Sequence, residues 1–98
     1  MQFDIASLKN YSVSALAMAR GEHTIEEVGD GSAVVFVILY GCIQITRQRS
    51  GQPASFCLHA RPSAPLFLIN PGRYCVVAES NVLGVRGTRR GGNQACTF

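Results

Sequence analysis

Apolar residues along this chain gather in short runs, most of which alternate with polar residues, and turn-forming residues separate the runs. A period of two places successive side chains on opposite faces of a strand. The segment Cys42–Arg47 shows this pattern, with Ile43 and Ile45 on one side and Gln44 and Thr46 on the other. The pattern predicts strands at 11–20, 23–28, 33–39, 42–47, 54–59, 66–69, 74–80 and 82–85.

One run departs from the alternation, because Ala33–Leu39 is apolar at every position. A continuous apolar run of this length predicts a central strand that is buried on both faces. Two turn signals stand out, Gly29–Gly31 and Asn70–Gly72, in which glycine tolerates positive φ and proline fixes φ. Gly29–Gly31 leads into a strand and not into a helix, so it predicts a hairpin turn and not a phosphate-binding loop.

The predicted strands define the fold class. Seven or eight short strands with turns between them are typical of an all-β sandwich or barrel with antiparallel strands. At most one short helix is expected, at Asp4–Lys9, where Asp4 would cap the first turn.

Composition bounds the domain organisation and suggests a partner. The 98 residues are 47% apolar and 15% charged, which fits one domain with its own core at residues 1–85. An Arg- and Gly-rich tail, residues 86–98, is expected to be mobile. A charged fraction below the usual quarter indicates that a partner covers part of the surface.

The cysteines and the apolar runs bear on location. The four cysteines form no CxxC pair, which argues against structural zinc, and no signal-peptide pattern precedes them. Cys42, Cys57 and Cys75 lie in apolar segments, so we expect reduced core residues in a cytoplasmic protein. The longest apolar run, Ala33–Tyr40, has eight residues, whereas a transmembrane helix needs about 20, so no membrane contact is expected.

Catalytic patterns are weak. Glu26 and Glu27 are adjacent, so a strand would point them to opposite faces, and we interpret them as a solvated edge. His23 and His59 are interpreted as surface residues, and no GxSxG motif marks a nucleophile. The expectation is therefore a protein that is not an enzyme and has no cofactor.

Three segments carry a family resemblance. They are residues 34–45 (VVFVILYGCIQI), residues 56–58 (FCL) and residues 66–77 (LFLINPGRYCVV). Their order resembles the cupin superfamily, a small jelly-roll β-barrel, and in particular the N-terminal regulatory domain of AraC-family transcription activators, including those that switch on type III secretion. The resemblance covers roughly residues 20 to 85 and implies a ligand-binding and dimerisation domain. The helix-turn-helix half of such regulators has no counterpart in this sequence.

The chain departs from metal-binding members of that superfamily. Those members carry two His and one Glu before the first Gly, and a further His after the Pro-Gly turn. Here Val34 takes the place of the Glu, no His occurs around Gly29–Gly31, and Cys75 takes the place of the last His. The resemblance therefore implies a metal-free cupin.

Ligand contacts are expected at the mouth of the barrel, where small molecules enter such folds. Tyr40 ends the most apolar run, and Arg73 and Tyr74 follow the Pro-Gly turn, although core packing of the tyrosines and solvation of the arginine compete with this interpretation. The candidate ligand contacts are His23, Tyr40, His59, Arg73, Tyr74 and Cys75.

These observations favour a non-catalytic regulatory or sensor domain that binds a small-molecule effector or a protein partner and forms a homodimer. Direct nucleic-acid contact by this domain alone is not expected. Two alternatives remain. One is a small basic β-domain that binds nucleic acid through Arg86, Arg89 and Arg90, and the other is a metal-free cupin enzyme that acts on a small sugar or acid.

Overall fold

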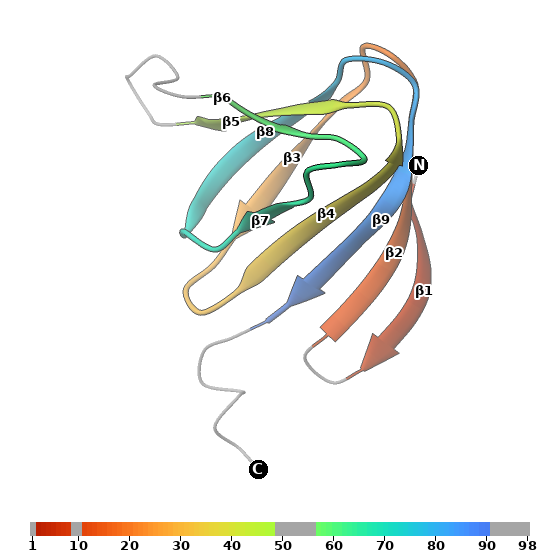
Figure 1. Ribbon diagram of the computed structural model, residues 1–98. Coiled ribbons are helices and arrows are strands. Elements are labelled where there is room, and N and C mark those ends of the chain that lie inside the picture. Colours follow the sequence, from red (N-terminus) through yellow and green to blue (C-terminus); the bar gives the residue numbers. More distant parts are fainter. Residues whose placement is uncertain (1, 9–10, 49–56, 91–98) are drawn as a thin grey trace.

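The computed structural model describes residues 2–8, 11–48 and 57–90, and every regular element in these ranges is a β-strand (Figure 1). The nine strands are β1 (Gln2–Leu8), β2 (Tyr11–Met18), β3 (His23–Val28), β4 (Ala33–Tyr40), β5 (Ile43–Gln48), β6 (Cys57–Ala60), β7 (Leu66–Leu68), β8 (Gly72–Ala78) and β9 (Val82–Arg89).

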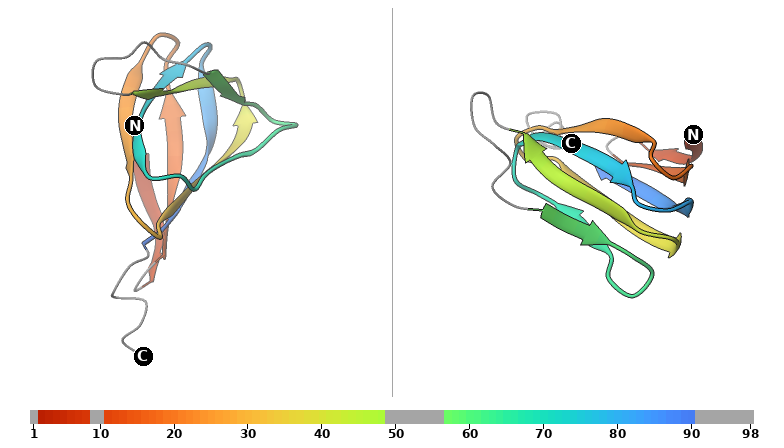
Figure 2. Two further views of the ribbon diagram at one scale, coloured as in Figure 1. Left: turned by 90° about the vertical axis from the view of Figure 1, so that its left-hand side faces the viewer. Right: turned by 90° about the horizontal axis from the view of Figure 1, so that it is seen from above.

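The strands form two antiparallel sheets that face each other (Figure 2). The order in the five-stranded sheet is β1-β2-β9-β4-β7, and the order in the four-stranded sheet is β3-β8-β5-β6. Strands that are distant in sequence are therefore neighbours, and β9 lies between β2 and β4. The all-β prediction is confirmed.

One core fills the space between the sheets, and both sheets contribute to it. On β4 the buried residues are Val34, Phe36 and Ile38, and on β5 they are Ile43 and Ile45, which alternate with residues that face outward. Each such side chain contributes about 1.5–3 kcal/mol relative to an exposed one. The other buried apolar residues are Leu16, Met18, Val28, Ala60, Leu68, Tyr74, Val76, Ala78 and Val82.

The prediction that β4 is buried on both faces is wrong. Its inward residues are buried, but Val37 is 41% exposed and Leu39 is 69% exposed on the outer side. The residues on the outer face of β4 are apolar as well, although no part of the described chain covers them.

The predicted helix Asp4–Lys9 is also wrong, because residues through Leu8 form β1 and Lys9 lies outside the described residues. β1 pairs with β2, and the register shifts between Asp4 and Ala6, so that Ile5 is an extra, bulged residue. A helix of six residues is marginal in water, whereas an edge strand gains backbone hydrogen bonds along its whole length.

The last strand is longer than predicted. β9 does not end at Val85 but continues through Arg89, and residues 86–89 pair with β2 on one side and with β4 on the other. The first part of the supposed tail therefore belongs to the middle strand of the larger sheet. Residues 91–98, also expected to be mobile, lie outside the described residues.

Gly31 and Gly41 lie in two of the turns that connect the sheets. At Gly29–Gly31, Ser32 N donates to Gly29 O at 3.0 Å and Gly31 has φ +73°. The turn carries the chain from the four-stranded to the five-stranded sheet, so it is tight as predicted but does not form a hairpin within one sheet. Gly41, at φ +90°, connects β4 back to β5, and an added Cβ there would collide with the backbone of Asn81.

Among the described residues, Cys42, Cys57 and Cys75 form no disulfide. The prediction that they are core residues is wrong, because Cys57 is exposed, the other two are half-buried, and none belongs to the core cluster. They occupy outward positions or a strand end. Cys96 lies outside the described residues, and the described part of the chain contains no helix with the length and hydropathy to span a bilayer.

Candidate functional site

The outer side of the five-stranded sheet carries an unusual concentration of apolar side chains. Strand alternation and register place residues of β2, β9, β4 and β7 on this side. We call this surface the outer apolar face. Its described apolar members are Tyr11, Val13, Ala15, Ala17, Ala33, Val35, Val37, Leu39, Tyr40, Phe67, Leu83, Val85 and Gly87.

Exposure distinguishes this face from the rest of the described surface. Among the residues whose side chains the structure describes, eight large apolar residues are exposed, and six of them lie on strands of this sheet. Phe67 is 65% exposed and Leu83 is 56% exposed. The six residues are Tyr11, Val37, Leu39, Tyr40, Phe67 and Leu83. Large contiguous apolar patches on soluble domains mark interaction sites.

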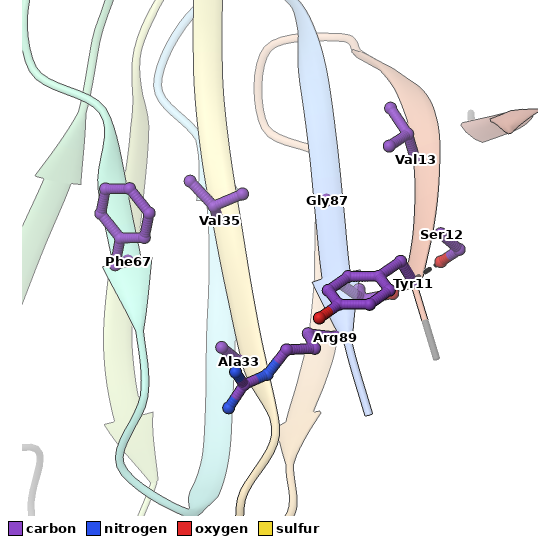
Figure 3. A pocket seen from close by; sticks show the side chains of 9 residues that line it. Tyr11, Ser12, Val13, Ala33, Val35, Phe67, Gly87 and Arg89 are labelled. Carbon is purple, nitrogen blue, oxygen red and sulfur yellow. Dashed lines mark hydrogen bonds between the residues drawn. The ribbon is translucent and has the colours of Figure 1, made fainter. Parts of the chain in front are cut away.

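A groove crosses this face where β9 carries no side chain. Gly87 lies between Val13 of β2 and Val35 of β4, and Tyr11 and Phe67 stand at the sides (Figure 3). The groove has a volume of about 270 Å³. A Cβ at Gly87 would lie 3.0 Å from Val35 Cγ1, so the depth of the groove depends on glycine at this position.

Charge lies toward the ends of the outer apolar face, and at one end Glu22 lines a hollow together with Ala17 and Leu83. Among its described outward positions, Arg89 is the one charged residue, and it lies beside Tyr11 at the end of the groove (Figure 3). Its Nη2 donates to Gly31 O at 3.2 Å. The middle of the face therefore has no charge that a partner would have to neutralise.

The outer side of the four-stranded sheet has a different character. Its outward positions include Glu27 and Arg73, with an Arg73 Nε to Glu27 Oε1 distance of 3.8 Å, and both side chains are mostly exposed. Gln44 Nε2 donates to Cys57 Sγ at 2.8 Å. This side is a mixed polar surface of the kind that water solvates.

A thiol, a carboxylate and an imidazole meet at one end of that sheet. The Cys42 thiol donates to Glu79 Oε1 at 3.2 Å, and His59 Nε2 lies 3.4 Å from the same oxygen. Burial raises the pKa of the Cys42 thiol, and Glu79 raises it further by hydrogen bonding and charge, against a lowering by Arg61. A thiol in this state is a poor nucleophile, because the thiolate is the reactive form.

Inside the sandwich, Glu26 and Arg86 form a two-point ion pair. Arg86 Nε donates to Glu26 Oε2 at 2.8 Å, and Arg86 Nη2 donates to Glu26 Oε1. Glu26 is 6% exposed, so the prediction that it lies on a solvated edge is wrong. Glu27 does point to the other face, as predicted. The pair connects β3 of one sheet with β9 of the other, and a buried carboxylate requires such a partner.

The residues do not fit the metal that many cupins hold. Among the described residues, no group of three or more His, Cys, Asp or Glu side chains is placed to hold a metal ion. Val34, in the position of the family's Glu, is buried in the core, and Cys75, in the position of its last His, alternates with the buried Tyr74 and Val76 and so faces outward.

The structure does not bring the predicted ligand contacts together. His23, His59, Arg73 and Cys75 are outward positions on three strands of the four-stranded sheet. Tyr40 is exposed at the end of β4, on the other sheet. Tyr74, the last of the six candidates, is buried, and its hydroxyl donates to Asn70 O at 2.7 Å.

The three candidate nucleic-acid arginines also do not form one patch. Arg86 points inward to Glu26, whereas Arg89 and Arg90 are exposed at the end of β9. Sequence reasoning missed the ion pair, and it expected a surface covered by a partner without locating the outer apolar face. The signals that could have found them are a charged residue at an inward strand position, Glu26, and an outward position filled by leucine or phenylalanine, as at Leu39 and Phe67.

Sequence comparisons identify no relative, since no protein-family model and no curated protein matches the chain. Solved structures do match it. A cupin superfamily protein from Desulfitobacterium hafniense superposes with a TM-score of 0.75 at 16% identity, over 93% of this chain and 77% of that one.

Two further solved structures extend this result. The cupin_2 domain of an XRE family transcriptional regulator from Enterobacter cloacae matches with a TM-score of 0.72 at 8% identity, over 94% of this chain and 97% of that one. The Cnp3 cupin domain of Schizosaccharomyces pombe matches at 0.71 and 11% identity, over 92% and 60%. The predicted cupin jelly roll is confirmed as the fold.

Proposed function

We propose that this chain is a non-catalytic regulatory domain that acts through protein contact, as the resemblance to AraC-type regulatory domains suggests. One structurally similar protein is a cupin domain of a transcriptional regulator, which supports a regulatory role. The free thiols of Cys42, Cys57 and Cys75 support a cytoplasmic location, where cysteines stay reduced.

The outer apolar face carries this proposal. Six exposed large apolar residues on one sheet are costly in solubility, and a protein contact is the ordinary reason for retaining them. In its interior, by contrast, the Glu26 and Arg86 side chains neutralise each other and the rest of the described core is mainly apolar. The chemistry of a reaction chamber is therefore not favoured. A regulatory signal would act by shifting the population between free and associated states.

The experiment compares an interior variant with a surface variant. Glu26→Met with Arg86→Leu replaces the ion pair by apolar residues, a change that cores tolerate. We expect it to leave the sedimentation coefficient unchanged across a concentration series, whereas Val37→Lys on the outer apolar face lowers it. Thr46→Lys, on the outer side of the other sheet, is the matched control.

Metal analysis completes the test. We expect purified protein to carry no stoichiometric transition metal, and its melting temperature to stay constant on addition of Mn²⁺, Fe²⁺, Ni²⁺ or Zn²⁺. A stoichiometric metal, or a sedimentation change in the interior variant that Val37→Lys lacks, would overturn the proposal and restore the enzyme interpretation.

A further inference from the structure

We propose that the partner on the outer apolar face is a second copy of this chain, in a two-fold dimer whose axis crosses β9 at Val85. The inference rests on the proposed function, because it names the partner for the contact proposed there. The axis lies between the two facing sheets and runs across the strands.

Self-complementarity of β9 is the first argument. Leu83, 56% exposed, is a projecting side chain, and the groove above Gly87 is a recess, and each lies two residues from Val85 on the same strand. Rotation about Val85 places Leu83 of each copy over Gly87 of the other. A two-fold interface has this property, since the same patch serves both subunits and each contact occurs twice.

The recess fits its occupant in chemistry. Val13 and Val35 form its walls and Gly87 its floor, so an aliphatic side chain that enters it meets apolar groups (Figure 3). Its volume of about 270 Å³ accommodates a leucine side chain. A charged or polar occupant would find Arg89 at one end and no other charged residue in the described lining.

Charge placement selects the orientation. The formal net charge is +3, so two copies repel each other as a whole. The repulsion is smallest when uncharged parts of the two surfaces meet. With the axis across the strands at Val85, the two Arg89 positions are eight residues apart along the strands, which is roughly 26 Å and beyond the Debye length of about 8 Å in physiological salt. An axis along β9 would instead stack Arg89 on Arg89.

The face is large enough for a stable dimer. The five strands have three to eight residues each, and at about 3.3 Å per residue and 4.8 Å per strand they cover about 540 Å² in projection. The corrugation of the side chains adds to that area, and stable interfaces bury about 800 Å² per partner. Two sheets that pack face to face also reproduce the ordinary geometry of a β-sandwich.

Chemical cross-linking tests the geometry. A residue on a two-fold axis faces its own copy, so Val85→Cys, in a chain whose four natural cysteines are replaced by serine, should give a covalent dimer with a short bifunctional maleimide. Arg89→Cys lies on the same strand but far from the axis, and Thr46→Cys lies on the other sheet, so neither should cross-link. Melting temperatures verify that each variant is folded.

Light scattering and sedimentation equilibrium provide the second measurement. Leu83→Asp should raise the dimer dissociation constant by at least about 30-fold, the effect of losing a central hot-spot contact. Thr46→Asp should leave the dissociation constant unchanged. A chain truncated after Arg90 should behave like the full chain, and a dimer that appears only after truncation would instead identify residues 91–98 as the occupant and overturn the inference.

The outcomes separate the two proposals. If the chain dimerises but Val85→Cys gives no cross-linked dimer and Leu83→Asp leaves the dimer intact, this geometry is wrong. The proposed function is not affected by that result. A chain that is monomeric at every concentration overturns the second copy as partner, while the metal analysis, which does not depend on self-association, still tests the proposed function.

Discussion

The outer sides of the two sheets have the same strand alternation but opposite chemistry. On the four-stranded sheet the outward positions hold residues such as Gln44, Glu27 and Arg73, which water solvates. On the five-stranded sheet they hold residues such as Val37, Leu39 and Phe67. Both sheets contribute buried apolar residues to the shared core, so burial of the inner faces does not explain the difference between the outer sides. It agrees with the proposal that one side is adapted to water and the other to a protein surface.

The comparison of the two outer sides assumes that contacts between the inner faces hold the sheets together. The largest predicted effect tests this assumption. Arg86→Leu alone leaves the Glu26 carboxylate buried without its partner, and we expect the free energy of unfolding to fall by about 3–5 kcal/mol. Urea denaturation at pH 7 measures the loss. Adding Glu26→Met should recover most of it, and a double variant as unstable as the single one would contradict the prediction.

The next prediction tests whether a second copy covers the outer apolar face. If a second copy covers the outer apolar face, folding and association are linked, and a hundredfold rise in protein concentration should raise the melting temperature by about 5 °C or more. Leu83→Asp should abolish this concentration dependence, whereas Thr46→Asp should preserve it. Differential scanning calorimetry at several concentrations makes the measurement, and identical concentration dependence in all three proteins would argue against a face-specific contact.

A smaller effect is expected on the polar side. Glu27 and Arg73 form an exposed ion pair, and such pairs contribute about 0–1 kcal/mol. Arg73→Ala should therefore change the free energy of unfolding by at most about 0.5 kcal/mol. Denaturant titration in low and high salt would reveal a larger contribution, which would mean that this side is not merely solvated.

The smallest effect concerns the thiol at the end of the four-stranded sheet. Burial and Glu79 hold the pKa of Cys42 above its ordinary value, so little thiolate exists at pH 8. Glu79→Gln removes the negative charge, lowers this pKa toward its ordinary value, and should speed alkylation of Cys42 by iodoacetamide a few-fold. Cys75 in the same protein is the internal control. Equal rates for Cys42 in both proteins would show that burial alone protects it.

Alternation in the sequence predicts most of the strands, because it follows directly from burial of one face. The segment from His23 to Val28 is a strand with the predicted bounds. The apolar run of β4 misled the prediction, because an uninterrupted apolar pattern is typical of a strand with two buried faces. A strand with one face in the core and the other toward a partner produces the same pattern. Sequence alone does not distinguish a core from an interface.

The site was less predictable than the fold. Glu26 and Arg86 are 60 residues apart in the chain and meet because β3 and β9 face each other across the core. The inward position of Glu26 could have indicated a buried charge, but no residue near either side chain in the sequence identifies its partner. The candidate ligand residues were chosen from turns and strand ends, and the sheet register then distributed them over both sheets. Their placement depends on long-range pairing, which residue spacing does not encode.

β9 is synthesised after every other strand that the structure describes, yet it is the middle strand of the larger sheet. While the ribosome is still translating that segment, β2 and β4 each have an edge of unpaired amides and carbonyls that the missing strand will later satisfy. Such edges recruit foreign strands, and long-range pairing of this kind is slow. The nascent chain therefore exposes two unpaired strand edges, which favour aggregation, until β9 inserts between them.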